Sequence, residues 1–99
     1  MSADLNITPP FHAIITVVGS DKVGIIAKVS SFLAEHDINI EDITQTVLSG
    51  NFVMMMMVNL SSCRDALEEI KRKLASLGDT LNVSISIMHE KVFSAMHRI

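Results

Sequence analysis

The chain has 99 residues, a formal net charge of −3 and a single cysteine, Cys63. A chain of this length forms one domain with one modest core, and its acidic balance argues against a nucleic-acid partner. One cysteine can form no internal disulfide and lacks the CxxC spacing of a soft-metal or redox site. Because no apolar run could cross a bilayer and residues 1–10 carry no signal-peptide pattern, we expect a cytoplasmic protein without a membrane partner.

The composition also bears on assembly. Hydrophobic residues make up 48% of the chain and aromatic residues only 4%, so we expect an aliphatic core rich in methionine. This is more apolar material than a small domain readily buries, and surplus apolar surface indicates a subunit interface. The composition therefore predicts a homo-oligomer.

The first third of the chain predicts a lead, a strand and a helix. We expect residues 1–11 to be disordered or loosely attached, since residues 1–10 are polar and end in two prolines. Residues 12–18 are apolar in both alternating sets, which is typical of a strand covered on both faces. From Ile25 to His36, apolar residues recur at helical spacing with polar residues opposite, which predicts an amphipathic helix.

A short polar loop, residues 19–24 (GSDKVG), joins this strand to this helix. Such a connection leaves several amide N–H groups at the helix N-terminus without intrahelical partners, which makes a site for an anion. Gly24 has no Cβ, so it permits positive φ and lets a ligand or another chain approach the backbone. The alternative is an ordinary tight turn with Asp21 as the N-cap.

Residues 38–47 predict a second strand after Asp37 interrupts the helical pattern. The apolar phase of this strand changes between Ile40 and Ile43, which indicates a bulge or bend near Glu41-Asp42. A turn predicted at residues 49–51 is short enough to make the next strand, residues 52–60, its antiparallel neighbour.

Four consecutive methionines, Met54 to Met57, lie in this third predicted strand. Thioethers are soft and adaptable, so such a run suggests a metal site or a promiscuous binding surface. Side chains in a strand alternate between its two faces, however, and four of them cannot converge on one ion. The run therefore predicts packing in the core or at an interface.

The last third of the chain predicts a helix, a strand and a helical tail. Ser61-Ser62 is the expected N-cap of a helix that stops at Gly78, and the charged residues of that helix form a solvated face. Residues 81–89 alternate strictly between apolar and polar, as in a strand with one solvated face. Residues 90–99 predict a short helix that must pack on its own sheet or on a partner.

This order of elements predicts a ferredoxin-like α+β sandwich, in which two helices cover one face of a four-stranded antiparallel sheet. The first and third strands are expected to be central, because both are apolar on two faces. We expect a domain over residues 12–89 and a helical tail over residues 90–99. No cofactor is implied.

The fold alone does not identify a function. Three classes of protein are nevertheless disfavoured, because this chain lacks the residues that each class requires at its site. An RNA-recognition module would carry aromatic side chains on its third strand, and residues 53–58 have none. A metal chaperone would carry a CxxC in the first loop. A P-loop would follow its second glycine with lysine and a hydroxyl residue, where this chain has Ile25-Ile26.

Two stretches, IITVVGSDKVGII (residues 14–26) and LAEHDINI (residues 33–40), carry a recognisable pattern. They resemble the ACT domain, a small-molecule-sensing module. The similarity covers residues 13–88, and the ending MHRI (residues 96–99) looks like that of short stand-alone single-ACT-domain proteins. The resemblance implies a homodimer that binds an amino acid or similar effector at its subunit interface.

The resemblance also implies the site. Residues of the first loop would form one wall of the pocket, and an asparagine would come from the neighbouring subunit. Helix N-terminal amides suit a carboxylate, Asp21 could receive an ammonium group, and Asn39 offers a donor and an acceptor. Asn39 at a strand start could equally be a turn residue. Gly19 stands where amino-acid-sensing members often carry a polar side chain. The implied ligand-binding residues are Asp21, Lys22, Val23, Gly24, Ile25 and Asn39.

Three functions remain open at this point. The first is a non-catalytic regulatory module whose regulated partner, an enzyme or transporter, is a separate protein. The second is a small enzyme or metal-binding protein that uses scattered carboxylates and the histidines His12, His36, His89 and His97, although the spacing of His89 and His97 matches no ligand motif. The third is a purely structural interaction protein, which would dimerise without a ligand.

Overall fold

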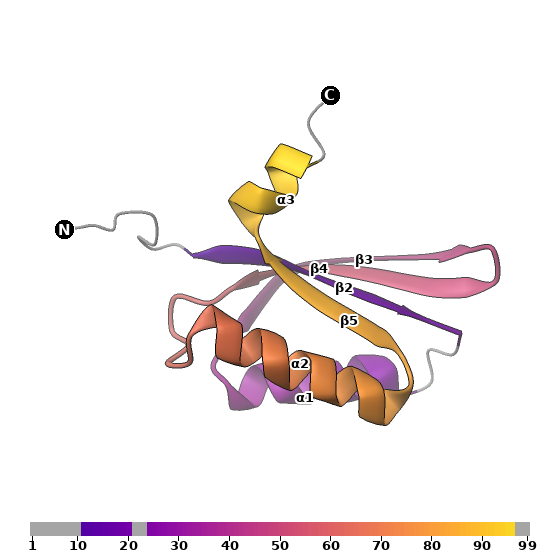
Figure 1. Cartoon of the computed structure of the whole chain (residues 1–99), viewed down its shortest axis with the longest axis horizontal. Helices are drawn as coiled ribbons and strands as arrows, with labels where there is room; N and C mark the ends of the chain where they lie inside the picture. Colours follow the sequence, from indigo (N-terminus) through magenta and orange to yellow (C-terminus); the bar gives the residue numbers. More distant parts are fainter. Residues whose placement is uncertain (1–10, 21–23, 97–99) are drawn as a thin grey trace.

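The computed structural model of the protein describes residues 11–20 and 24–96. Its elements, in chain order, are β2 (His12–Gly19), α1 (Ile25–Glu35), β3 (Asn39–Leu48), β4 (Asn51–Asn59), α2 (Leu67–Leu81), β5 (Ser84–His89) and α3 (Glu90–Met96). The predicted ferredoxin-like order of strands and helices is confirmed, and a short C-terminal helix follows it (Figure 1).

One antiparallel sheet holds the four strands in the order β3-β4-β2-β5. The strands β2 and β4 are central, as their apolar residues on both faces predicted. Both α1 and α2 lie on one face of the sheet, and α3 stands on the other side (Figure 1). In this strand order, β3 and β5 are the two edges of the sheet.

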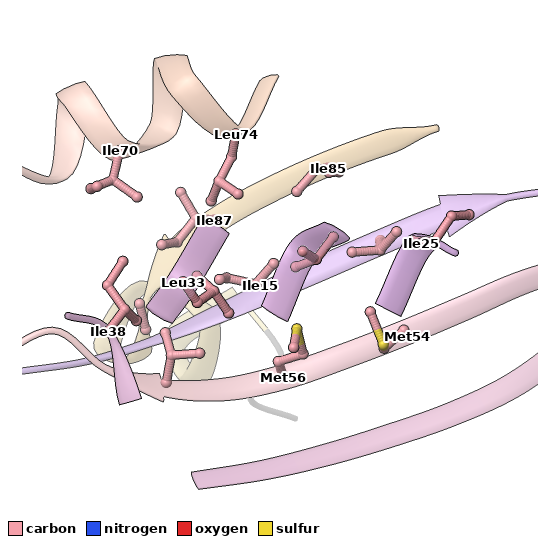
Figure 2. Packing of buried hydrophobic residues seen from close by; sticks show 14 of the residues in the cluster. Ile15, Ile25, Leu33, Ile38, Met54, Met56, Ile70, Leu74, Ile85 and Ile87 are labelled. Atoms are coloured by element: carbon pink, nitrogen blue, oxygen red, sulfur yellow. The ribbon is translucent and has the colours of Figure 1, made fainter. Parts of the chain in front are cut away.

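The core lies between the sheet and the two long helices. Met54 and Met56 of β4 are fully buried, as are Leu33 of α1 and Ile70 and Leu74 of α2. Figure 2 shows these side chains pointing into the same layer from the strand and from both helices. Burying an aliphatic or methionine side chain contributes about 1.5–3 kcal/mol, so this layer is the main source of stability.

The methionine run alternates as a strand requires. Met55 and Met57 are only partly buried, and they lie on the sheet face away from α1 and α2 together with Ile14 and Thr16 of β2. The four thioethers therefore do not converge on one point, in agreement with the predicted packing role.

The hairpin of β3 and β4 confirms two local predictions. The register shifts between Ile40 and Asp42, so the extra residue of the predicted bulge is Glu41. Ser49 and Gly50 have φ of 54° and 79°, and Leu48 pairs with Asn51 across them. Two successive residues with positive φ give the primed turn whose twist matches that of an antiparallel pair.

The start of α2 was predicted wrongly. Ser61-Ser62 does not cap this helix, which begins at Leu67 with Ala66 as its N-cap and no side-chain capping bond. The Oγ atom of Ser61 instead accepts a hydrogen bond from the Phe11 amide at 3.0 Å. A serine satisfies exposed amides in any turn, so its presence near a helix does not fix the helix start.

The predicted end of α2 at Gly78 is also wrong, because the helix continues to Leu81 and the strand β5 begins only at Ser84. A Cβ on Gly78 would lie 2.7 Å from the carbonyl oxygen of Val83. The glycine thus permits the chain that leaves the helix to fold back against it. The helix ends at Asn82, which adopts the left-handed conformation.

The tail helix predicted over residues 90–99 is present as α3 over the described part of that range. It has no buried residue, and the exposed fractions of Val92 and Met96 are 50% and 64%. The division of the chain into a lead, a domain over 12–89 and a tail remains a prediction.

Candidate functional site

The predicted anion site lies where β2 gives way to α1 (Figure 1). Gly24 is the N-cap of α1, with φ of 77° and therefore in a conformation that favours glycine. No side chain caps the helix and its first turn contains no acidic residue. Within the described part of the chain, the first amides of α1 therefore have no side-chain acceptor and no neutralising charge.

The predicted ligand-binding residues fare differently in this region. Asp21, Lys22 and Val23 lie outside the described residues, as does the alternative use of Asp21 as an N-cap. Gly24 is exposed. Ile25 is only 4% exposed and its side chain belongs to the core, so it offers a ligand nothing beyond its backbone amide.

Gly19, at the end of β2, lies against the turn that follows α2. A Cβ on Gly19 would overlap Cγ1 of Val83 and lie 3.2 Å from its Cβ. This position therefore has no room for the polar side chain that amino-acid-sensing ACT domains often carry there. Gly19 is a packing residue that brings the α2–β5 turn next to the first loop.

An open hollow of about 400 Å³ lies at this end of the sheet. The turn after α2 supplies Asn82 and Val83, and the paired residues Val18 and Ser84 supply the strand side. The sequence interpretation assigned none of these residues to a site. A signal for Asn82 was available, since asparagine often ends a helix in the left-handed conformation, but nothing in the sequence placed that turn beside residue 19.

Asn39 lies at the opposite end of the same sheet. It is exposed and pairs with Asn59, which pairs in turn with His12 at the start of β2. Gly19 closes β2 at the far end, roughly 23 Å away at about 3.3 Å per residue. Within one chain, Asn39 and the first loop therefore do not form a common pocket.

The described histidines are held by carboxylates or by backbone in separate places. His12 Nε2 lies 2.8 Å from Glu41 Oε1, and His36 Nδ1 lies 3.0 Å from Asp65 Oδ2. His89 Nδ1 accepts the amide N–H of Lys91 at 3.0 Å. Across residues 11–20 and 24–96, no group of three or more His, Cys, Asp or Glu side chains is arranged to hold a metal ion.

The bulge residue Glu41 makes a second side-chain contact besides the one with His12. The side-chain amide of Asn59 donates to Glu41 Oε2 at 3.1 Å. This hydrogen bond, and then the hydrogen bond and charge of His12, hold the pKa of the Glu41 carboxyl below its ordinary value. These contacts join β2, β3 and β4 at the end of the sheet where Asn39 lies. They therefore hold the first residues of β3 in place against the two central strands.

Comparison with known proteins gives close matches over nearly the whole chain. A family model described as "ACT domain" matches residues 12–88. The chain is 47% identical over 88 residues to the UPF0237 protein lmo0533 of Listeria monocytogenes, an overlap that covers 89% of this chain and 99% of that protein. The solved structure of an ACT domain protein from Streptococcus pneumoniae matches with a TM-score of 0.76 and 45% identity, covering 88% of this chain and 98% of that one.

A more distant structure shares the fold alone. It is a putative glycine cleavage system transcriptional repressor, which matches with a TM-score of 0.73 at 19% identity and covers 90% of this chain and 52% of that one. None of the helices in the described residues is both long and apolar enough to span a membrane. Because the family model covers most of the chain, and relatives that are almost wholly covered match 88–89% of it, the chain belongs to the ACT domain family, whose members are commonly regulatory ligand-binding modules.

Proposed function

We infer that this protein is a non-catalytic regulatory module, a homodimer that binds a small amino-acid-like molecule between its subunits. The observation that carries this proposal is the separation of the two halves of the implied site. The first loop lies at one end of the sheet and Asn39 at the other. A second copy of the chain is therefore needed to complete the pocket.

The edge strand β3 offers a way to bring the halves together. This strand runs in the same direction as β2, so Asn39 lies level with His12 and Val47 lies level with Gly19. If two β3 edges pair antiparallel about a twofold axis, Asn39 of one copy reaches the end of the joined sheet that holds the partner's first loop.

The exposed surface of β3 supports this pairing. An unprotected edge strand is a template for another strand, because its outer N–H and C=O groups have no partner within the sheet. Residues 41–48 of β3 are all exposed. Val47 and Leu48 are 67% and 65% exposed, which adds apolar area to be buried.

The chemistry of the two halves fits an amino acid. The first amides of α1, which no described side chain caps, can bind a carboxylate, and no acidic residue in the first turn opposes it. The Asp21 carboxylate is proposed to receive the ammonium group, and Asn39 to donate and accept hydrogen bonds across the interface. A ligand bound in this way favours the dimer, or one of its partner-bound states, by its differential affinity.

The proposal is tested by titration calorimetry of the full chain against the twenty amino acids and common anions, with light scattering to follow the oligomeric state. We expect a dimer and a saturable signal from at least one amino acid. Asn39→Ala and Asp21→Asn are expected to weaken that signal about tenfold each, the usual effect of losing one hydrogen bond to a charged group.

Glu68→Ala serves as the control, because Glu68 is exposed on α2 and lies outside both the proposed β3 interface and the loop after β2. It should bind as the wild-type protein does. A dimer that gives no signal with any compound would support the purely structural interaction protein instead, and a monomer would exclude a site shared between subunits.

A further inference from the structure

A second cavity, of about 380 Å³, lies where β2 begins and β5 ends. Its walls include Phe11 before β2, Cys63 in the segment between β4 and α2, and His89 at the end of β5. This sheet end also holds Asn39, but Asn39 lies on the edge strand β3 and His89 on the opposite edge. None of the residues proposed above to bind the effector lines this cavity.

The size and apolar lining suit a small molecule rather than a few waters. Binding cavities for small molecules begin at about 300 Å³ and are mostly apolar. Phe11, Leu60 and Leu67 supply an aromatic and aliphatic wall. At about 30 Å³ for each water-sized atom, the cavity has room for a molecule of roughly ten non-hydrogen atoms.

Two polar side chains in the lining offer a hydrogen-bond donor. Ser61 Oγ already accepts the Phe11 amide, so the Ser61 hydroxyl keeps its proton for another acceptor. His89 Nδ1 accepts the Lys91 amide, which assigns the proton of the neutral ring to Nε2. Neither donor has a partner within the described part of the chain, and no side chain caps the amides of α2 that begin at Leu67.

The charge of the lining disfavours an anionic occupant. Asp65 contributes a carboxylate, whose Oδ2 lies 3.0 Å from His36 Nδ1 and 3.5 Å from Lys73 Nζ. Both contacts are made by the same oxygen, Oδ2, and the charged carboxylate still lines the cavity. A carboxylate ligand would be placed beside a like charge, whereas a neutral carbonyl oxygen would accept from the free donors without that repulsion.

We propose that this cavity is a second binding site, for a small uncharged molecule with an apolar body and a carbonyl oxygen, such as an amide, ester or lactone. The apolar body lies against Phe11, Leu60 and Leu67, and the carbonyl oxygen accepts from Ser61 or His89. The described lining residues all belong to one chain, and the site is proposed to act independently of the effector site between subunits.

Benzamide is the test probe, with toluene and benzoate as matched compounds that lack the carbonyl or add a charge. In titrations of the isotope-labelled full chain followed by nuclear magnetic resonance, benzamide should shift amides of residues 60–67 and 89–91 with a dissociation constant on the order of millimolar. Toluene should bind about three- to tenfold more weakly, which is the effect of one lost hydrogen bond.

Ala66→Leu and Ala75→Leu form the matched pair of variants. Ala66 lines the cavity and Ala75 does not, and both are exposed residues associated with α2. Filling the cavity with Ala66→Leu should weaken benzamide binding at least about tenfold, while Ala75→Leu should leave it unchanged. Equal binding by both variants, or shifts centred elsewhere, would overturn the proposal.

The thiol of Cys63 gives an independent readout. Burial raises the pKa of this thiol, so alkylation by iodoacetamide near neutral pH should already be slow. Benzamide should slow it further in the wild-type protein and not in Ala66→Leu. Toluene binding as tightly as benzamide would refute the role of the carbonyl, and tighter binding of benzoate would refute the preference for an uncharged molecule.

Discussion

Gly19 and Gly24 flank the same loop, but they are glycine for different physical reasons. At Gly19 the space is taken, because Val83 occupies the position where a Cβ would stand. At Gly24 no described residue beyond its chain neighbours would lie within 4 Å of a Cβ, and the requirement comes from a φ of 77°. Gly19 is therefore required by the packing of two distant segments, and Gly24 by the conformation of its own backbone.

This difference predicts how the two substitutions behave. Gly19→Ala should lower the free energy of unfolding by about 1–3 kcal/mol, the usual effect of overpacking. The second substitution Val83→Ala should recover part of that loss. Gly24→Ala should lower it by about 1–2 kcal/mol through the left-handed backbone alone, with no recovery from Val83→Ala. Urea denaturation of the wild type, the three single variants and the two double variants measures these energies, and additive losses at Gly19 and Val83 would contradict the packing explanation.

Glu41 gives a prediction that depends on pH. The Asn59 amide and His12 lower its folded-state pKa from 4.5, so its stabilising contribution is present above the unfolded-state value and is lost as pH falls through the folded-state value. Glu41→Gln should therefore be less stable than the wild type near pH 7 and approach the stability of the wild type as pH falls below 4.5.

Urea denaturation over this pH range measures that difference. Glu68→Gln is the control, since Glu68 is exposed and has no ion pair among the described residues. A gap between Glu41→Gln and the wild type that stays constant with pH would show that the lowered pKa does not stabilise the fold.

The two long helices end in the same way, although their sequences share no terminating glycine. The amide of Ile38 donates to the Leu33 carbonyl at 2.9 Å, and that of Val83 donates to the Gly78 carbonyl at 2.9 Å. The residue before each donor, Asp37 or Asn82, adopts positive φ near 60°. Each helix thus ends in a Schellman motif whose left-handed position is filled by a polar residue in place of glycine.

Asp37→Gly should therefore raise the free energy of unfolding by about 0.5–1 kcal/mol, because glycine adopts this conformation without strain. The exposed control Ala75→Gly, inside α2, should lower it by about 1 kcal/mol. Thermal and urea denaturation both measure the change. A loss of stability in Asp37→Gly would mean that its carboxylate contributes more than the strain of its backbone costs.

At the scale of the whole molecule, apolar surface remains after the core is filled. Val47 and Leu48 are exposed on the β3 edge, and Val92 and Met96 are exposed on α3. The β3–β4 turn and α3 lie in separate parts of the molecule (Figure 1). The proposed dimer forms through the β3 edge. A charged substitution in β3 should therefore disrupt the dimer, whereas one in α3 should not.

Val47→Lys should convert the dimer to a folded monomer, because a lysine on an edge strand opposes pairing with another strand. Met96→Lys, on α3, is the matched control and should leave the dimer intact. Light scattering of the full chain at micromolar concentration, with circular dichroism to verify folding, distinguishes them. If Met96→Lys dissociates the dimer and Val47→Lys does not, α3 and not β3 forms the interface.

Local patterns predicted the sheet well because they record burial on each strand face. The two central strands were recognised from apolar residues in both phases, and the bulge from the phase change between Ile40 and Ile43. The ends of α2 were predicted wrongly because serine and glycine commonly mark helix ends. Here Ser61 and Gly78 instead make contacts with other segments of the chain. Ser61 binds the amide before β2, and Gly78 admits the returning chain.

The sequence by itself determined the order of the strands and helices, which strands are central, and membership of the ACT domain family, since periodicity and motif are properties of neighbouring residues. Only the tertiary structure decided that Gly19 is held by Val83, that Asn39 and the first loop lie at opposite ends of the sheet, and that Ser61 and His89 share a cavity. Those relations join residues far apart in the chain, and the register of strands and the packing of α2 set them rather than any local preference.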